Sequence, residues 1–203
     1  MKRFAVVLAL LALLVACGDA TPERAQPRRA VPASSPDDDD AAAVRARLEE
    51  IDALVSTWHE SEDLRGAHAA AEAAANLVVG PNGPGYGDRD GDGEIAGAND
   101  EGLLPGSDGT PAGLASPLAT DECVARDVLA GTTTDPAAAW AQLDDVLAAW
   151  TPSSNTMPQL ASHPMRLVGW ATLALRADSL DDAHEFAGHA ALHVHVAQDA
   201  LDC

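Results

Sequence analysis

Apolar residues recur at helical spacing through most of the chain beyond residue 40. In the first such stretch, residues 41–60, the apolar positions are spaced alternately by four and three, which predicts an amphipathic helix with one core-facing side. These positions are Val44, Leu48, Ile51, Val55 and Trp58. A second helix is predicted from about Leu64 to Val79, because Gly80-Pro81 is a strong stop signal.

Further helices are predicted from start and stop signals along the rest of the chain. Ser116-Pro117 is an N-cap and first-turn pair for a helix that ends near Gly131. Asp135-Pro136 opens the next helix, which Pro152 ends. The apolar stripe of that helix is Trp140, Leu143, Leu147 and Trp150. The last two predicted helices run from Pro164 to Ala177 and from Ser179, with Asp182 three residues later, almost to Cys203.

The absence of sustained period-two alternation argues against a sheet. Aromatic residues make up only 3% of the chain and alanine dominates, which favours helix over strand. The predicted fold class is therefore all-α, a bundle of four to six helices, with a long Asp/Gly-rich loop at 80–115 between the second and third helices. The four tryptophans are expected in its core.

The charge balance restricts the partners. The formal net charge is −20, and no lysine follows Lys2. A chain this acidic repels nucleic acid and anionic lipid headgroups, so we expect neither to bind its surface.

The N-terminus carries an export signal. Met1-Lys2-Arg3 precedes an apolar stretch, Phe4–Val15, that is too short for a good membrane span. It ends in Leu14-Val15-Ala16-Cys17, which resembles the lipobox of bacterial lipoproteins. The resemblance implies removal of residues 1–16 and acylation of Cys17. An ordinary signal peptide or a short anchor helix is the alternative.

The segment after the cysteine predicts a tether. Residues 17–40 are rich in proline and small polar residues and end in four aspartates, a composition that predicts disorder. Residues 41–203 are then one domain. The lipoprotein resemblance implies an exported protein anchored in the cell envelope by its lipid. Asp19 is third rather than second counted from Cys17, so the usual inner-membrane retention signal is absent and the outer membrane is favoured.

Two cysteines remain once Cys17 carries lipid. Outside the cytoplasm, Cys123 and Cys203 are expected to pair in a disulfide. The bridge would fasten the C-terminal residue to the middle of the chain.

The strongest chemical motif is an acidic loop. Residues 88–101 hold six acids and one arginine, and that density of carboxylates is self-repelling without a cation. Asp88, Asp90 and Asp92 alternate, Gly93 follows as a turn residue, and Glu94 offers its backbone carbonyl. Ca²⁺ takes about six to eight oxygen ligands, and this spacing supplies them from one short segment. The implied cofactor is Ca²⁺.

The loop resembles EF-hand and dockerin-like calcium loops, and it departs from them at the twelfth position. There Asn99 replaces the bidentate glutamate, so Asp100 or Glu101 would close the shell, with Asp100 preferred for its shorter side chain. Asn99 and Glu101 stay as additional candidate ligands. The resemblance also implies that Ile95 pins the loop to the protein. Leu103-Leu104-Pro105 is expected to dock the loop's exit onto the bundle.

A second candidate site lies on the last predicted helix. Glu185, His189 and His193 follow one another at spacings of four, and the two histidines suit a transition metal. His68 and Glu72 on the second predicted helix could face them. The order His184-Glu185-His189 does not match the zinc protease pattern H-E-x-x-H, and Glu-x-x-His does not occur.

Three functions remain open at this point. The leading hypothesis is a lipid-anchored envelope protein that is a calcium-ordered structural or binding module and not an enzyme. The first rival is a transition-metal or haem bundle that uses the histidines. The second rival is an envelope enzyme, for which the chain offers no recognised catalytic motif.

Overall fold

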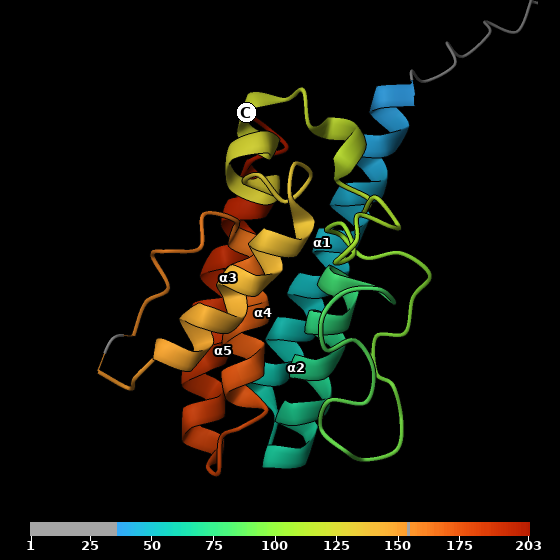
Figure 1. Ribbon diagram of the computed structural model, residues 1–203. Coiled ribbons are helices and arrows are strands. Elements are labelled where there is room, and N and C mark those ends of the chain that lie inside the picture. The colour runs from blue at the N-terminus through green and yellow to red at the C-terminus, as the bar shows by residue number, and fades with distance from the viewer. Residues whose placement is uncertain (1–35, 154) are drawn as a thin grey trace, which may run out of the picture. The chain divides into compact units, whose positions relative to one another are not determined.

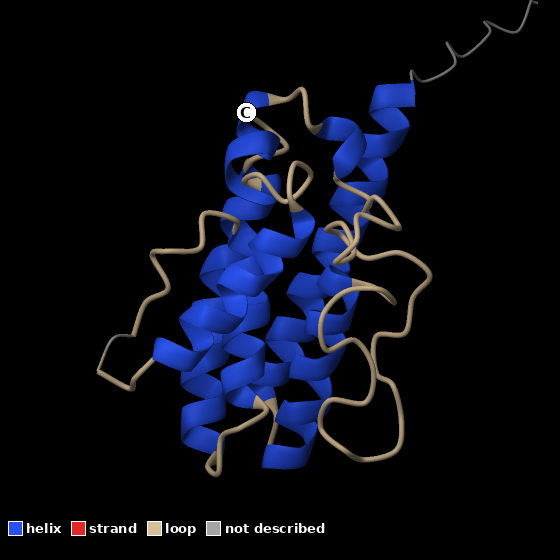
Figure 2. Cartoon of the chain, viewed as in Figure 1, coloured by secondary structure: helices blue, strands red, loops and turns tan. Residues whose placement is uncertain are grey.

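The computed structural model describes residues 36–153 and 155–203, so the predicted signal peptide, Cys17 and most of the tether lie outside the described residues. Over the described ranges the chain forms five α-helices and no strand, which confirms the all-α fold class (Figures 1 and 2). The helices are α1 (Pro36–Glu60), α2 (Leu64–Val79), α3 (Pro136–Ala149), α4 (His163–Ala174) and α5 (Leu180–Asp199).

Four of the helices form the bundle. Helix α1 packs against α2 and α5, and α4 packs against the same two helices, so the four close a ring around a shared core. Helix α3 packs on α4 from outside this ring (Figure 1). The long connection between α2 and η1 (Ser116–Leu118) lies beside α2.

The periodic apolar residues of 41–60 form the buried side of α1. Its five predicted core residues are all buried, with exposures from 0% to 1%, because one side of the helix faces α2 and α5. The helix begins at Pro36, so it includes the aspartates at 37–40 that composition assigned to the tether. Proline in the first turn and acids near a helix N-terminus both favour that start.

The segment 116–131 differs from the single predicted helix. It holds a short 3-10 turn, η1, and a π-helical piece, η2 (Val124–Leu129). The Asp121 carboxylate accepts hydrogen bonds from the backbone N–H groups of Cys123 and Val124, at 2.9 and 3.0 Å. An aspartate used in this way caps a new helix and interrupts the preceding one. The starts of α3 and α5 agree with prediction, since Asp135 and Ser179 cap these helices.

The predicted disulfide and most of the predicted core are confirmed. Cys123 and Cys203 are bonded, with their Cα atoms 6.2 Å apart. Trp58, Trp140 and Trp170 are buried, with exposures of 0 to 3%. Trp150 departs from the expectation, because it is only partly buried and lines a cavity. None of the helices in the described ranges has the length and apolar character needed to cross a membrane.

Candidate metal centre

Two polar side chains are buried on the side of α2 that faces the long loop. Glu72 is 1% exposed and Asn76 is 0% exposed, although the surrounding residues of α2 are mostly alanine. The two are one helical turn apart and therefore share a face. Buried polar groups are costly unless they are hydrogen-bonded, so their partners indicate what this face does.

Glu72 holds the acidic loop at two places, near its start and in its middle. Its Oε2 accepts hydrogen bonds from the backbone N–H groups of Arg89 and Asp90, at 2.5 and 3.0 Å. Its Oε1 accepts another from the Ala96 N–H at 2.7 Å. Hydrogen bonds to an ionised carboxylate are stronger than those between neutral groups. Glu72 thus fastens the loop to α2 at two points.

Asn76 makes a second fastening one turn along α2. Its side-chain nitrogen donates to the carbonyls of Gly87 and Ala96, at 2.9 and 2.7 Å, and its oxygen accepts from the Gly87 N–H at 3.2 Å. The backbone lies so close to the helix that a Cβ atom on Gly97 would clash with the Ala73 carbonyl. The loop is therefore docked on α2 by polar contacts.

The loop aspartates fold the chain around their own carboxylates. Asp88 Oδ1 accepts from the N–H groups of Gly91 and Asp92, and Oδ2 accepts from Gly93, at 2.7 to 3.0 Å. Gly93 has a φ of 95°, a left-handed value that glycine adopts at low cost, which supports its predicted role as the turn residue. Asp90 and Asp92 each accept one further backbone N–H, from Asp92 and Glu94, at 3.0 and 2.9 Å. The carboxylates are thereby oriented by the backbone.

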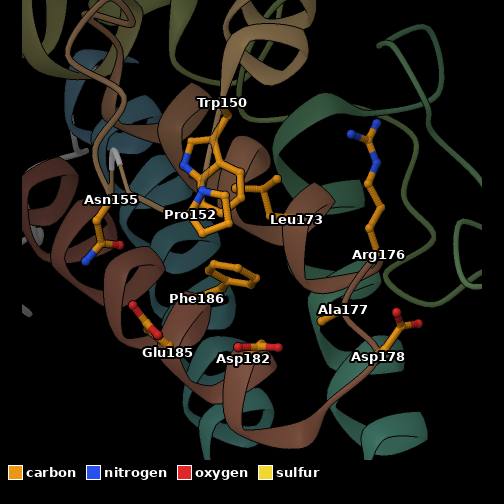
Figure 3. A pocket seen from close by; sticks show the side chains of 10 residues that line it. All are labelled: Trp150, Pro152, Asn155, Leu173, Arg176, Ala177, Asp178, Asp182, Glu185 and Phe186. Carbon is orange, nitrogen blue, oxygen red and sulfur yellow. The ribbon is translucent and has the colours of Figure 1, made fainter.

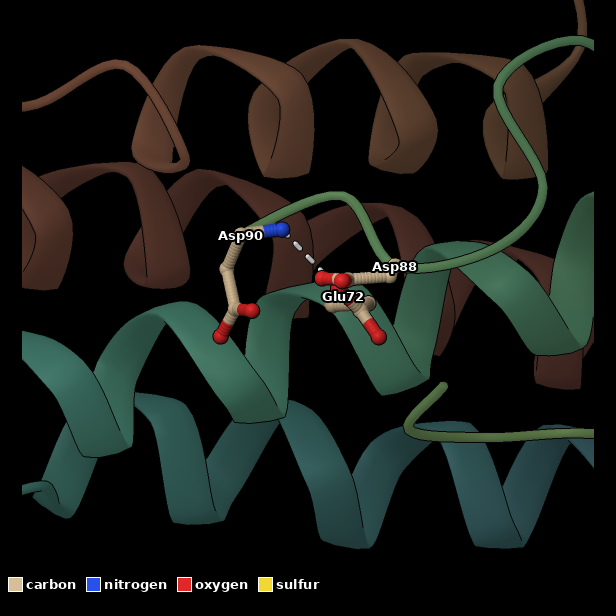
Figure 4. Close-up of side chains that lie close together, drawn as sticks. All are labelled: Glu72, Asp88 and Asp90. Atoms are coloured by element: carbon tan, nitrogen blue, oxygen red, sulfur yellow. Dashed lines mark hydrogen bonds between the residues drawn. The ribbon is translucent and has the colours of Figure 1, made fainter. Parts of the chain in front are cut away.

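Glu72 joins the loop carboxylates in one cluster. One oxygen from each of Glu72, Asp88 and Asp90 lies within 4.8 Å of the others (Figure 4). Opposite ligands of a Ca²⁺ ion are about 4.6–5.2 Å apart, twice the Ca–O distance, so three such oxygens are close enough to share one ion. The donor set is also of the hard, anionic kind that Ca²⁺ prefers.

Two arginines lie beside these carboxylates. Arg65 forms an ion pair with Asp92 at 3.5 Å, with an Arg65 side chain that is 80% exposed. Arg89 instead turns back and donates to the carbonyls of Gly85 and Pro84, at 2.5 and 3.1 Å. Burial lowers the pKa of the Arg89 guanidinium, and the nearby Glu72 carboxylate opposes that effect. Arg89 thus braces the entry of the loop.

The other predicted ligands lie outside the cluster. Glu94 and Asp100 are exposed, and neither they nor Asp92 belong to the three-residue group found in the described part of the chain. The Asn99 side chain donates to the carbonyls of Asn76 and Gly97, each at 2.9 Å. The Glu101 side chain accepts from the Gly113 N–H at 3.1 Å. The structure therefore brings Glu72, and not Asp100, to the predicted ligands Asp88 and Asp90.

The apolar anchors of the loop are only partly as predicted. The prediction for Ile95 is wrong, because 48% of this residue is exposed. The polar contacts of Glu72 and Asn76 hold the loop where an apolar contact was expected. The loop exit docks as predicted, since Leu103 and Leu104 are 0% and 1% exposed. Their N–H groups bond to the Leu77 and Val78 carbonyls, each at 3.0 Å, which satisfies carbonyls at the end of α2.

The sequence contains a pattern that indicates the buried polar role of Glu72. Glu72 and Asn76 are the charged and amide residues in the run Ala69–Val79, which is otherwise alanine, leucine and valine. Polar residues at this spacing in an apolar run indicate a buried polar face that needs partners. The predicted pairing of Glu72 with His68 does not supply such partners, whereas the backbone of the acidic loop does.

The histidine side of α5 has a different geometry. The His189 ring stacks on Trp170, with centroids 4.3 Å apart, and His193 Nδ1 lies 3.0 Å from His163 Nδ1. Glu185 is exposed at a cavity lined by Trp150 and Phe186. Over the described ranges, these three predicted ligands do not bring their donor atoms together as a group.

The His163–His193 contact requires at least one neutral ring, because one of the two Nδ1 atoms must accept the hydrogen bond. Burial lowers the pKa of His193 to about 3, and His163, Arg166 and His189 add to the effect. Burial, followed by Arg166, also lowers the pKa of His163, while Asp127 opposes this. One neutral ring donates its Nδ1 proton to the other, so the pair serves as a hydrogen bond between α4 and α5.

Comparisons with known proteins do not identify a relative of this chain. No family model, no curated protein and no solved structure matches the chain.

Proposed function

We propose that residues 36–203 are a calcium-binding module in which Ca²⁺ fastens the segment 85–99 to helix α2. The carrying observation is the carboxylate cluster of Glu72, Asp88 and Asp90, whose oxygens lie within 4.8 Å of one another. Glu72 takes the place of the glutamate that is missing at the twelfth loop position. It does so from a neighbouring helix and not from the loop itself.

The proposed ion has both a local and a wider effect. It would be held by the carboxylates of Asp88, Asp90, Asp92 and Glu72, together with the Glu94 carbonyl, and would offset the repulsion among the acids. Because Glu72 and Asn76 already hold the loop, the ion strengthens an existing contact and exposes no new surface. Sites outside the cytoplasm work at about 10⁻⁴–10⁻³ M Ca²⁺, which suits a permanently filled structural ion.

The proposed setting is the cell envelope. It is supported by the predicted export signal and the lipobox-like Leu14–Cys17, which lie outside the described residues. A lipid on Cys17 would anchor the protein to the membrane, and the module would act as a structural or binding unit without a catalytic centre.

Calorimetric titration of the full-length protein with CaCl₂ tests the proposal. We expect one binding event and, at tenfold excess over Kd, a stabilisation of about 1.4 kcal/mol that EGTA removes. Glu72→Gln keeps the size and one acceptor of the side chain but removes its charge, so it should weaken Ca²⁺ binding at least tenfold.

The matched control is Glu94→Gln, an exposed glutamate that is proposed to use only its backbone carbonyl. This variant should bind Ca²⁺ within about twofold of the parent, because its side chain makes no ion contact. If Ca²⁺ produces neither heat nor a melting shift, the calcium module is refuted. Equal losses in the two variants would remove Glu72 from the ligand set.

A further inference from the structure

A cavity of about 410 Å³ lies between α4, α5 and the chain that follows α3 (Figure 3). Its apolar wall comes from Trp150, Pro152, Leu173 and Phe186. Small-molecule sites in proteins have about this volume, an apolar lining and a few polar groups at their edge. The cavity is built from residues other than the carboxylate cluster on α2, so it is independent of the proposed calcium site.

The aromatic residues of this wall form a fixed array. The Trp150 and Phe186 rings meet edge to face, with centroids 5.7 Å apart and an interplanar angle of 80°. Phe186 in turn stacks on the buried Trp170, at 5.8 Å and 24°. The core tryptophan therefore holds Phe186 in place while Trp150 remains partly exposed at the cavity. Aromatic ring faces that remain accessible attract cations.

The rim of the cavity is acidic. Asp178, Asp182 and Glu185 line it, and all three are exposed. Over the described residues no ion pair involves any of them, and Asp182 accepts one hydrogen bond from the Ser179 hydroxyl at 2.7 Å. The one basic lining residue, Arg176, points away from Asp178 and Asp182 in Figure 3. The lining thus holds three carboxylates and one guanidinium, which leaves it net negative.

We propose that this cavity binds a small organic cation, an ammonium group carried on an apolar body. The apolar body would lie against Trp150, Phe186 and Leu173, and the ammonium would lie between the aromatic faces and the carboxylates of Asp182 and Glu185. Charge complementarity selects this class over neutral or anionic molecules. The net charge of −20 adds a field that concentrates cations near the site.

Three probes of one shape and different charge test the proposal by calorimetry on the full-length protein. They are 2-phenylethylammonium, 2-phenylethanol and 3-phenylpropanoate. We expect the ammonium to bind, the alcohol to bind about tenfold more weakly and the carboxylate to bind least, because only the ammonium gains from both the rings and the rim. Ammonium affinity should fall as salt is added, since the rim is exposed.

Variants locate the binding. Glu185→Gln should weaken the ammonium about threefold and leave the alcohol unchanged, since it removes rim charge without apolar surface. Asp199→Asn is the matched control, an exposed acid at the other end of α5, and should change neither affinity. Phe186→Leu should reduce the preference for ammonium over alcohol, because it removes a ring but keeps an apolar side chain.

Several results would overturn the proposal: equal binding of ammonium and alcohol, no binding of any probe, or equal effects of Glu185→Gln and Asp199→Asn. The ammonium affinity should be the same in Ca²⁺ and in EGTA. An affinity that disappears with EGTA would attribute the binding to the calcium loop and would overturn the cavity as a separate site. If the protein does not bind Ca²⁺, the ammonium should still bind in the cavity.

Discussion

The segment 85–99 and the side of α5 that carries His189 and His193 both contain metal-binding residue types. The packing of neighbouring helices brings possible ligands together in the first region and separates them in the second. In the first region Glu72 reaches Asp88 and Asp90 from another element, and three carboxylates share one small volume. In the second region His189 stacks on Trp170 and His193 bonds to His163, so each histidine has a partner of its own. Metal-binding residues on one side of a helix do not make a metal site unless neighbouring elements contribute further ligands.

The two regions also differ in what their polar side chains do. Glu72 and Asn76 hold backbone groups of a long loop, in which Ile95 is 48% exposed. The His163–His193 pair joins two helices that already pack closely through apolar residues. Removing the first set should therefore cost more than removing the second.

The largest effect is expected for Glu72→Ala. The change leaves the N–H groups of Arg89, Asp90 and Ala96 without their acceptor, and each unsatisfied donor costs roughly 1–3 kcal/mol. We expect a loss of about 3 kcal/mol in the free energy of unfolding without Ca²⁺, measured by urea denaturation with EGTA. Glu72→Gln, which keeps one acceptor, should lose less. A loss below about 0.5 kcal/mol for Glu72→Ala would show that the loop does not depend on this carboxylate.

Asn76→Ala is expected to have the next largest effect. It removes three hydrogen bonds between neutral groups, which are weaker than those of a carboxylate, so we expect about 2 kcal/mol. Calcium should still bind, with reduced affinity, because Asn76 positions the loop without contacting the ion. Urea denaturation and calorimetry on the same sample measure both quantities. Complete loss of calcium binding would mean that Asn76 belongs to the site itself.

Local features of the fold could be predicted from the sequence, whereas contacts between distant segments could not. The core side of α1 and the caps at Asp135 and Ser179 follow from local spacing, and the structure has them where expected. The role of Glu72 depends on partners 17 to 24 residues away, which a helical pattern does not specify. The exposure of Ile95 has the same cause, because the EF-hand analogy supplied an apolar anchor where this loop uses a polar one.

A pH titration probes the histidine region. Because the pKa of His193 is about 3 in the folded chain and its ordinary value is 6.5, the unfolded state binds more protons between these values. The stabilising effect of neutral His193 is complete above pH 6.5 and is lost as the pH falls toward 3.

The variant His193→Gln removes this titration. We expect the melting temperature of the variant to fall about 3 °C less than that of the parent between pH 7.5 and pH 4.5, corresponding to about 1 kcal/mol for a partly exposed group. Scanning calorimetry across this range measures the difference. Parallel curves would show that the His163–His193 contact does not resist protonation. His195→Gln is a control, since His195 is more exposed and lies 3.4 Å from Asp52.

The smallest effect is expected for Asp100→Asn, and it is the sharpest test of which residue closes the calcium shell. By loop position Asp100 substitutes for the missing glutamate, whereas the structure leaves it exposed and outside the cluster that contains Glu72. We expect a change below about 0.5 kcal/mol in the free energy of unfolding and Ca²⁺ affinity within about twofold. A tenfold loss in Asp100→Asn with no loss in Glu72→Gln would mean that the loop closes through its own exit. The ion would then order the loop alone, without fastening it to α2.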